Sequence, residues 1–274
     1  MNAKHPNGRH ASQRHRLWVI PPGALAIALV VAAFVINKVW AADNLLGVWI
    51  ITSLLIAVSF ALIGLAAGRW EALFIDNRNR MSLSKLQVVL WTIPIFSALL
   101  AASCFNAAQG GDASTITGVA LDSKLWALLG ISLTTAVGAP IALSGKGSRK
   151  ASSAELKDTK ENLQAQTGVA ADKIDNIGHV LTKANPADAR WSDIVRGDDV
   201  GNADMIDFSK VQQLYFTLLT LLIFCLAVAN QFASVKASEI ITKLPVPDTG
   251  FLALLGVSGA GYLVYKGMSH SQDA

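Results

Sequence analysis

Residues 84–92 read Ser-Lys-Leu-Gln-Val-Val-Leu-Trp-Thr, and residues 209–217 read Ser-Lys-Val-Gln-Gln-Leu-Tyr-Phe-Thr. The two stretches align with each other without a gap. Each copy opens a long apolar run. Each of these runs is followed by another that carries a second shared string, Leu-Leu-Gly-Ile-Ser at 128–132 and Leu-Leu-Gly-Val-Ser at 254–258. Two matched strings in the same order indicate an internal repeat. The sequence therefore predicts a duplicated pair of helices.

The composition is typical of a membrane protein. Of 274 residues, 52% are hydrophobic and 15% charged, which is too apolar for an ordinary soluble domain. Helical runs of about 18 or more apolar residues can cross the hydrocarbon of a bilayer. The sequence contains six such runs: Leu17 to Trp40, Leu45 to Gly68, Leu86 to Ala107, Leu125 to Leu143, Val211 to Phe232 and Gly250 to Tyr265. We therefore expect an all-α, polytopic bundle of six spans in the lipid bilayer.

The positions of Lys and Arg predict the orientation of the spans. Cations gather in the N-terminal segment, between the second and third runs, in the long segment between the fourth and fifth, and after the sixth. The other loops hold only Lys38, Lys124, Lys236 and Lys243. The positive-inside rule then predicts cytoplasmic N- and C-termini. Helices 3–4 and helices 5–6 would form a parallel tandem repeat, unlike the inverted repeats of many transporters.

This topology divides the chain into six segments. They are a basic cytoplasmic tail at 1–16, a first transmembrane hairpin at 17–80, a first repeat hairpin at 81–148, a cytoplasmic loop at 149–207, a second repeat hairpin at 208–268 and a tail at 269–274. The first apolar run could instead be a secretory signal, since Val39-Trp40-Ala41 resembles a cleavage site. Its length exceeds the roughly 7–15 apolar residues of such signals, which favours a span.

Two cysteines, Cys104 and Cys225, fall inside apolar runs. We expect both to be reduced and inert, because neither has metal-like spacing to a His or to the other Cys. The basic residues flank the apolar runs and do not form one patch, which argues against nucleic-acid binding. The long loop begins with a stretch rich in Lys, Ser and Glu that reads as flexible or loosely helical. A helix from about Ser152 to Gln166 is expected there, capped by Ser153.

The repeated box places Ser84, Gln87, Ser209 and Gln212 at the cytoplasmic ends of two helices. The serines could cap these helices, and the glutamines would enter hydrocarbon, where they need partners. Interhelical hydrogen bonding is the usual role of such a glutamine, and lining or gating a pore is the alternative.

Small and hydroxyl residues predict close helix contacts. They are Gly130, Ser132 and Thr134 in the fourth run, Gly256, Ser258 and Ala260 in the sixth, and the G-x-x-x-G pair Gly64 and Gly68 in the second. Small residues let two helix backbones approach each other, within the bundle or between subunits. The serines and threonines could instead line a narrow conduit.

The loop also contains a segment that combines aromatic, acidic and glycine residues, with Trp191, Asp193, Arg196, Asp198 and Asp199. We expect a short interfacial helix from Trp191 to Val195 that ends in a turn at Gly197, and a surface on which a partner protein docks. The carboxylate spacing does not match an EF-hand loop, so no metal is expected. Residue patterns of phosphate-binding loops, serine hydrolases and zinc proteases are missing from the sequence, so no catalytic residue and no cofactor is assigned.

Three sets of residues together resemble a group of uncharacterised bacterial integral membrane proteins. The sets are Arg78 to Gln87 with Trp91-Thr92, then Trp191-Ser192-Asp193 with Gly197-Asp198 and Gly201-Asn202, then Ala253 to Ser258 with Gly261-Tyr262. The likeness covers roughly residues 78–266. It implies a bacterial inner membrane and carries no activity with it.

These observations favour a non-catalytic, oligomeric platform in the inner membrane that engages a cytoplasmic protein partner through its long loop. Oligomerisation into homo-oligomers is expected because several small-residue faces offer more contact surface than six helices can bury. The alternative is an oligomeric pore for ions or small solutes. An enzyme is the least favoured class, because the sequence offers no cluster of titratable residues at a membrane-facing cleft. No Asp, Glu, Arg or His lies deep within an apolar run, which also disfavours a proton-coupled transporter.

Overall fold

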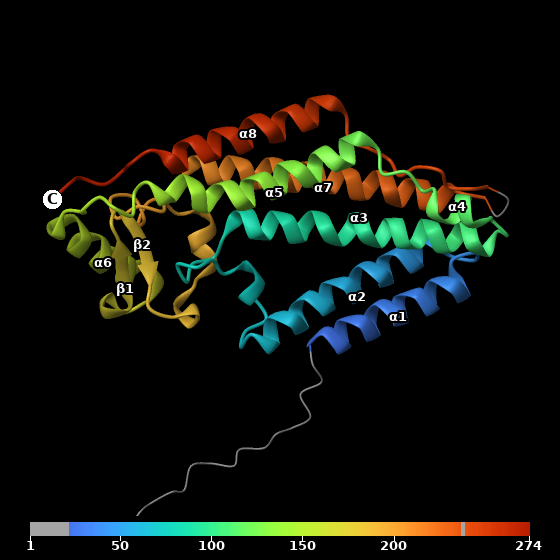
Figure 1. Ribbon diagram of the computed structural model, residues 1–274, viewed down its shortest axis with the longest axis horizontal. Coiled ribbons are helices and arrows are strands. Elements are labelled where there is room, and N and C mark those ends of the chain that lie inside the picture. Colours follow the sequence, from blue (N-terminus) through green and yellow to red (C-terminus); the bar gives the residue numbers. More distant parts are fainter. Residues whose placement is uncertain (1–21, 237–238) are drawn as a thin grey trace, which may run out of the picture.

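The computed structural model describes residues 22–236 and 239–274, and it is mostly helical. Six long helices run back and forth along the longest dimension of the molecule (Figure 1). They are α1 (Pro22–Trp40), α2 (Leu45–Ala66), α3 (Leu83–Ala108), α5 (Ser123–Ser144), α7 (Phe208–Ser234) and α8 (Thr249–Gly267). Within the described residues, α2, α3, α5 and α7 are long and apolar enough to cross a membrane. The start of the first expected span and the basic tail at 1–16 lie outside these residues.

Helix α3 lies at the centre of the bundle. It contacts α1 and α2 on one side and α5 and α7 on the other, and α8 packs against α5 and α7. Its buried face holds Trp91, Ile95, Ala98, Ala101 and Phe105, which pack with Phe224 and Val228 of α7. Small alanines lie between large aromatic side chains on this face, so neighbouring helices approach closely there.

Sequence features explain where the helices begin. Each of α2, α3, α5, α7 and α8 has an N-cap side chain that accepts a backbone N–H of its first turn; the caps are Asn44, Ser82, Asp122, Asp207 and Asp248. Such caps satisfy N–H groups that have no partner inside the helix. The cap of α3 is Ser82, two residues before the expected Ser84. Pro94 lies inside α3 and Pro140 inside α5.

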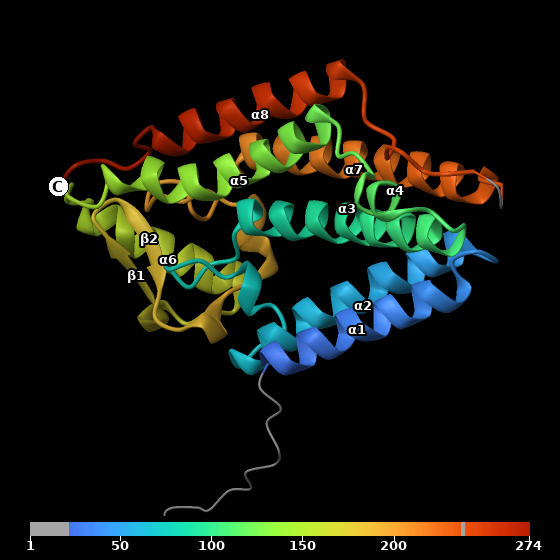
Figure 2. The ribbon, with the colours of Figure 1, turned by 45° about the vertical axis from the view of Figure 1, so that its right-hand side comes forward.

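A small folded domain, residues 146–207, sits at one end of the bundle (Figures 1 and 2). It contains α6 (Ser153–Thr167), an antiparallel hairpin of β1 (Ile174–Ile177) and β2 (Val180–Lys183), and 3-10 turns at Ala171–Lys173, Pro186–Asp188 and Trp191–Val195. Leu163, Ile174, Leu181, Val200 and Ala203 form its own core. The expected helix in this loop is confirmed, but Ser152 rather than Ser153 occupies the cap position, and its side chain makes no capping hydrogen bond to the described residues. The loop is compact rather than flexible, because it buries these apolar side chains.

The C-terminal tail lies on the same domain. Ser152 N donates to Gln272 O at 3.1 Å, and Ala274 N donates to Lys150 O at 3.0 Å. His179 Nδ1 lies 2.7 Å from Ser269 Oγ. The C-terminal end of α8 is therefore fixed at the domain end of the bundle. The opposite end carries the short helix α4 (Ala113–Thr117) and the loops before α5 and α8.

Candidate functional site

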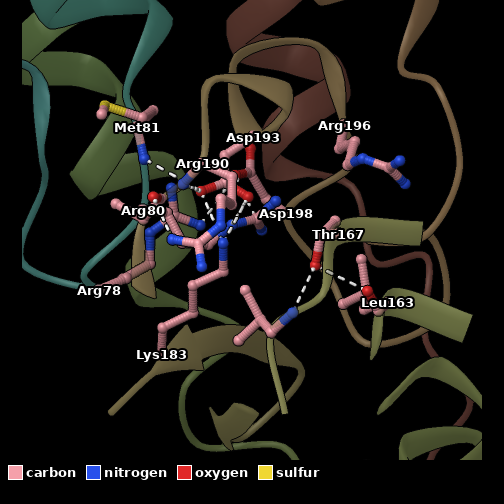
Figure 3. A network of polar contacts seen from close by, with 12 residues as sticks. Arg78, Arg80, Met81, Leu163, Thr167, Lys183, Arg190, Asp193, Arg196 and Asp198 are labelled. Carbon is pink, nitrogen blue, oxygen red and sulfur yellow. Dashed lines mark hydrogen bonds and ion pairs between the residues drawn. The ribbon is translucent and has the colours of Figure 1, made fainter. Parts of the chain in front are cut away.

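Asp198 lies at the centre of a buried ion cluster where the domain meets the helix ends (Figure 3). One carboxylate oxygen accepts from Arg78 Nη1 at 2.8 Å. The other lies 2.7 Å from Lys266 Nζ and 3.1 Å from Lys210 Nζ. Arg78 precedes α3, Lys210 is in the first turn of α7, and Lys266 is near the end of α8. One side chain of the domain thus binds the ends of three long helices.

Asp193 forms the second part of the cluster. Both of its carboxylate oxygens accept from Lys183 Nζ at 2.8 Å, and one also accepts from Arg190 N at 2.9 Å. Arg80 lies between the two carboxylates, with Nε at 3.9 Å from Asp193 and Nη1 at 3.7 Å from Asp198. These distances are too long for hydrogen bonds. Arg80 Nε and Nη1 are buried without a hydrogen-bond partner among the described residues.

The carboxylate of Asp199 makes a separate set of contacts. Its carboxylate accepts from Lys146 Nζ at 2.8 and 2.9 Å and from His270 N at 2.9 Å. Lys146 follows the end of α5, and His270 belongs to the C-terminal tail. The neighbouring carboxylates Asp198 and Asp199 therefore connect the domain to Arg78 before α3, to α7 and α8, and to the C-terminal tail. Asp199 also binds Lys146, where the domain follows α5.

The surroundings set the pKa values of these groups. Burial raises the pKa of the Asp198 carboxyl, but Lys210, Lys266, Arg78 and Arg80 outweigh this effect and hold it well below its ordinary value. Burial acts in the same direction on the pKa of Asp193, where Arg80 and Lys183 outweigh it and lower the pKa. Both carboxylates are therefore ionised at neutral pH.

The cations respond to the same competition. Burial lowers the pKa of Lys183, although Asp193 partly opposes this. Burial also disfavours the charged form of Arg78, but Asp198 and Asp76 outweigh it and raise the pKa of Arg78 above its ordinary value. Asp76 holds Arg78 Nη2 at 2.6 Å. Ion pairs this well buried offset their desolvation only when geometry and hydrogen bonds are good, so the cluster specifies one arrangement of the domain on the helices.

The expected docking residues divide into two groups. Asp193, Asp198 and Asp199 are at most 5% exposed, so these carboxylates are not on the surface of the folded chain. The prediction of a docking surface is therefore wrong for these three carboxylates, whose cationic partners are mostly distant in sequence. Trp191 is 43% exposed, and its ring packs near Trp70 and Phe74. Arg196 donates to Gln166 and to Asp204 O on the outside of the domain.

The two copies of the repeated box present different faces to the bundle. In the first copy Ser84 and Gln87 are buried and Lys85 is exposed. In the second copy Lys210 and Gln213 are buried, whereas Ser209 is half-buried and Gln212 is exposed. Lys210 turns inward because Asp198 provides its counter-charge. The matched strings therefore do not occupy matched positions in the packing, and Gln213 rather than Gln212 enters the interior.

Gln87 makes an interhelical hydrogen bond. Its Nε2 donates to Thr217 Oγ1 of α7 at 2.6 Å, and Thr217 Oγ1 also donates to Gln213 O at 2.8 Å. Ser84 Oγ lies 3.3 Å from Tyr262 Oη, which accepts from Lys266 Nζ at 3.0 Å. Polar side chains thus continue from the ion cluster into the space between α3, α7 and α8.

The predicted small residues of α5 and α8 line one open groove of about 440 Å³ rather than a tight contact; they are Gly130, Thr134, Gly256 and Ala260. A Cβ added at Gly130 would meet no heavy atom of the described residues within 4 Å. The close contact lies one turn away, where a Cβ at Gly259 would be 3.2 Å from Thr135. Ser132 and Ser258 are buried beside the groove.

Gly64 and Gly68 do not form a helix-contact pair. Gly68 lies beyond the end of α2, with a φ of +100° that suits the turn after the helix. Gly64 is needed because a Cβ there would be 2.3 Å from the carbonyl oxygen of Trp70, which folds back over α2. The G-x-x-x-G pattern here therefore marks a helix end.

Sequence reasoning missed the cations of the cluster. From the sequence, Arg78, Arg80, Lys210 and Lys266 count only as basic residues that predict the topology. All four are at most 8% exposed. A usable signal was present: carboxylates at 198 and 199 follow a glycine in a chain whose segments near the ends of the apolar runs are mostly basic. In the part of the chain that the structure describes, no group of three or more His, Cys, Asp or Glu side chains could hold a metal.

Comparison with protein-family models, curated proteins and solved structures finds no match to this chain.

Proposed function

We propose that the protein is a non-catalytic membrane platform whose domain, residues 146–207, binds a cytoplasmic protein partner. The observation that carries this proposal is the attachment of the domain to the helix ends through the buried carboxylates of Asp198 and Asp199. A domain attached in this way keeps one orientation relative to the membrane. A partner bound to it would be held at a fixed distance from the bilayer.

The exposed side of α6 is the surface that we assign to the partner. Lys157 and Glu161 form an exposed pair at 3.9 Å, and Asp158 is exposed beside them. Such an exposed pair contributes little to the stability of the fold, so Lys157 and Glu161 can pair with opposite charges on another protein instead. The exposed apolar residues near the start of α7, Met205, Ile206 and Phe208, lie where the helices begin and fit contact with lipid instead.

Six membrane crossings are part of the proposal. The tail after α8 hydrogen-bonds to the domain, so α8 returns along the bundle to the domain end. Helix α1 also begins at that end (Figure 1). A 19-residue helix is about 28 Å long, close to the thickness of the hydrocarbon layer. The positive-inside rule then favours a cytoplasmic position for both termini and the domain in a bacterial cell. The proposal also includes a homo-oligomer, for which the small residues along the open groove between α5 and α8 offer a contact surface.

Site-specific photo-crosslinking tests the platform. A crosslinking amino acid at Lys157 should capture one protein reproducibly in intact cells, while the same group at Ser114 near α4 should not. Reversing the charge of Glu161 by Glu161→Lys should abolish that capture without lowering the amount of protein in the membrane. Equal capture at both positions, or capture that is insensitive to Glu161→Lys, would contradict the proposal.

A pore is the second candidate, favoured by unpartnered polar atoms inside the bundle. Gln87 Oε1, Gln213 Oε1 and Ser258 Oγ are buried without hydrogen-bond partners among the described residues. Waters or ions in the interior would satisfy them. Purified protein in liposomes distinguishes the two functions: the platform predicts no flux, whereas a pore predicts a flux that changes with Gln87→Leu and Ser258→Ala.

A further inference from the structure

A cleft of about 250 Å³ opens between the end of α5 and the β1–β2 hairpin. Pro140, Leu143, Ile177 and Val180 form its apolar lining, and Asn77, Arg78, Ser144 and Thr182 its polar lining. A smaller cavity of about 30 Å³ adjoins it, because Asn77, Arg78, Pro140 and Leu143 line both. The smaller cavity also reaches Lys85 and Lys266. The cleft therefore leads from the surface to the edge of the ion cluster.

The inner cavity brings cationic donors together. Lys85 Nζ donates to Ile75 O at 2.6 Å, which leaves two of its three N–H groups for another acceptor. Arg78 uses its guanidinium on Asp76 and Asp198 and keeps N–H groups to spare. Asp76, which also lines the cavity, is already neutralised by Arg78 at 2.6 Å. The cavity is therefore suited to an anion.

The connected cluster carries more positive than negative charge. The cations are Arg78, Arg80, Lys183, Lys210 and Lys266, and the carboxylates are Asp76, Asp193 and Asp198. Asp207, which is buried and caps α7 next to Lys210, adds a fourth carboxylate, so the five cations still outnumber the carboxylates. The residues outside the described ranges, 1–21 and 237–238, contain no Asp or Glu. An uncompensated buried charge is unfavourable, so a further anion beside Arg78 would stabilise the cluster.

Arg80 lines neither cavity, but it shows that the cluster behind Arg78 has fewer acceptors than donors. Its side chain is 1% exposed, and two of its nitrogens lack hydrogen-bond partners among the described residues. Both Arg80 and Arg78 face the same oxygen of Asp198. Asp198 is the counter-charge of Arg78 and Arg80 and also of two lysines. An anion bound beside Arg78 would provide a second counter-charge. Arginine and lysine groups arranged in this way are typical of phosphate binding.

We propose that this cleft binds a phosphate group, either from the headgroup of an anionic phospholipid or from a free phosphate ion. The phosphate oxygens contact Lys85 and Arg78, and the apolar lining accommodates the remainder of a lipid. The cleft lies just beyond Val137 and Ile141, which are 63% and 66% exposed on the side of α5 and suit lipid contact. This position is the level at which lipid headgroups would meet the bundle.

Binding to the full-length protein in detergent tests the site. Isothermal titration calorimetry at constant ionic strength would use inorganic phosphate, dihexanoyl phosphatidylglycerol and dihexanoyl phosphatidylcholine. The variants are Lys85→Gln, which removes a donor, and Asn77→Asp, which places a carboxylate at the exposed entrance. Lys157→Gln on α6 is the matched control for the loss of a lysine charge.

We expect saturable binding by the native protein and by Lys157→Gln, weakened about tenfold in Lys85→Gln and in Asn77→Asp, since a charged hydrogen bond is lost or a repulsion is added. Stronger binding of phosphatidylglycerol than of inorganic phosphate assigns the lipid headgroup, and the reverse order assigns the free ion. The proposal is overturned if no phosphate compound binds, if phosphatidylcholine binds as well as phosphatidylglycerol while phosphate does not bind, or if Lys85→Gln and Lys157→Gln bind equally.

Discussion

Replacing Asp198 by asparagine should detach the domain from the helices. The substitution keeps the shape of the side chain but removes the charge that faces Arg78, Lys210 and Lys266 at 2.7 to 3.1 Å. Breaking a buried ion pair typically destabilises a protein by about 3–5 kcal/mol, because the remaining charges stay buried without a partner. We expect about 4 kcal/mol here. At about 1.4 kcal/mol per tenfold, the opening equilibrium of the domain rises roughly a thousandfold.

Hydrogen exchange measured by mass spectrometry on protein in detergent would report this opening. Amides of α6 and of the β1–β2 hairpin should exchange roughly a thousandfold faster in Asp198→Asn, while amides in the middle of α3 should keep their protection. The matched control is Asp204→Asn, because Asp204 accepts one hydrogen bond from Asn162 at the surface. Equal exchange in the two variants would refute the argument that Asp198 holds the domain in place.

Three further predictions follow from the same structure. The pKa of Asp198 is lower in the folded protein than in the unfolded chain, so the Asp198 carboxylate contributes its full stabilisation of the folded state above the unfolded value of about 3.9 and loses it as the pH falls through the lower folded value. The protection of α6 amides from hydrogen exchange should therefore be unchanged between about pH 7 and about pH 5. Gly178→Ala should lower the thermal midpoint clearly more than Gly168→Ala: both glycines have positive φ, at +61° and +70°, but a Cβ at Gly178 would lie 2.3 Å from Lys146 O, whereas Gly168 has open space. Gln87→Leu should destabilise the bundle by about 1 kcal/mol in denaturation from detergent, whereas Gln212→Leu, on an exposed face, should have little effect; equal effects would contradict the assignment of Gln87 to the interior.

The helices could be predicted because hydrophobicity is a local signal. The expected run at 45–68 corresponds to α2 at Leu45–Ala66, and the run at 125–143 corresponds to α5 at Ser123–Ser144. The small helix α6 also follows from local periodicity. Capping residues extended α3 and α7 by three residues at their N-terminal ends beyond the apolar runs. Those polar first turns carry the residues that reach the domain.

The ion cluster could not be predicted, because its pairs join residues far apart in the chain. Arg78 and Asp198 approach each other only when the domain folds against the start of α3. The positive-inside rule explains the same cations equally well as topology signals. The sequence therefore gives no reason to look for buried partners of these cations. The matched strings show a related limit: the similar sequences that begin at Ser84 and Ser209 do not reveal that Lys210 turns inward toward Asp198, whereas Lys85 is exposed.

The position of the two termini relative to the domain tests the central claim most directly. Four variants, all with Cys104 and Cys225 replaced by alanine, would each carry one new cysteine: at Lys160 in α6, at Ser114 near α4, after Ala274, or at the N-terminus. A membrane-impermeant thiol reagent would then be applied to intact cells that contain each variant. Six crossings predict labelling at Ser114 alone. Labelling at either terminus while the cysteine at Lys160 stays protected would mean that α1 or α8 does not cross the membrane, and labelling at Lys160 would contradict the cytoplasmic position of the domain.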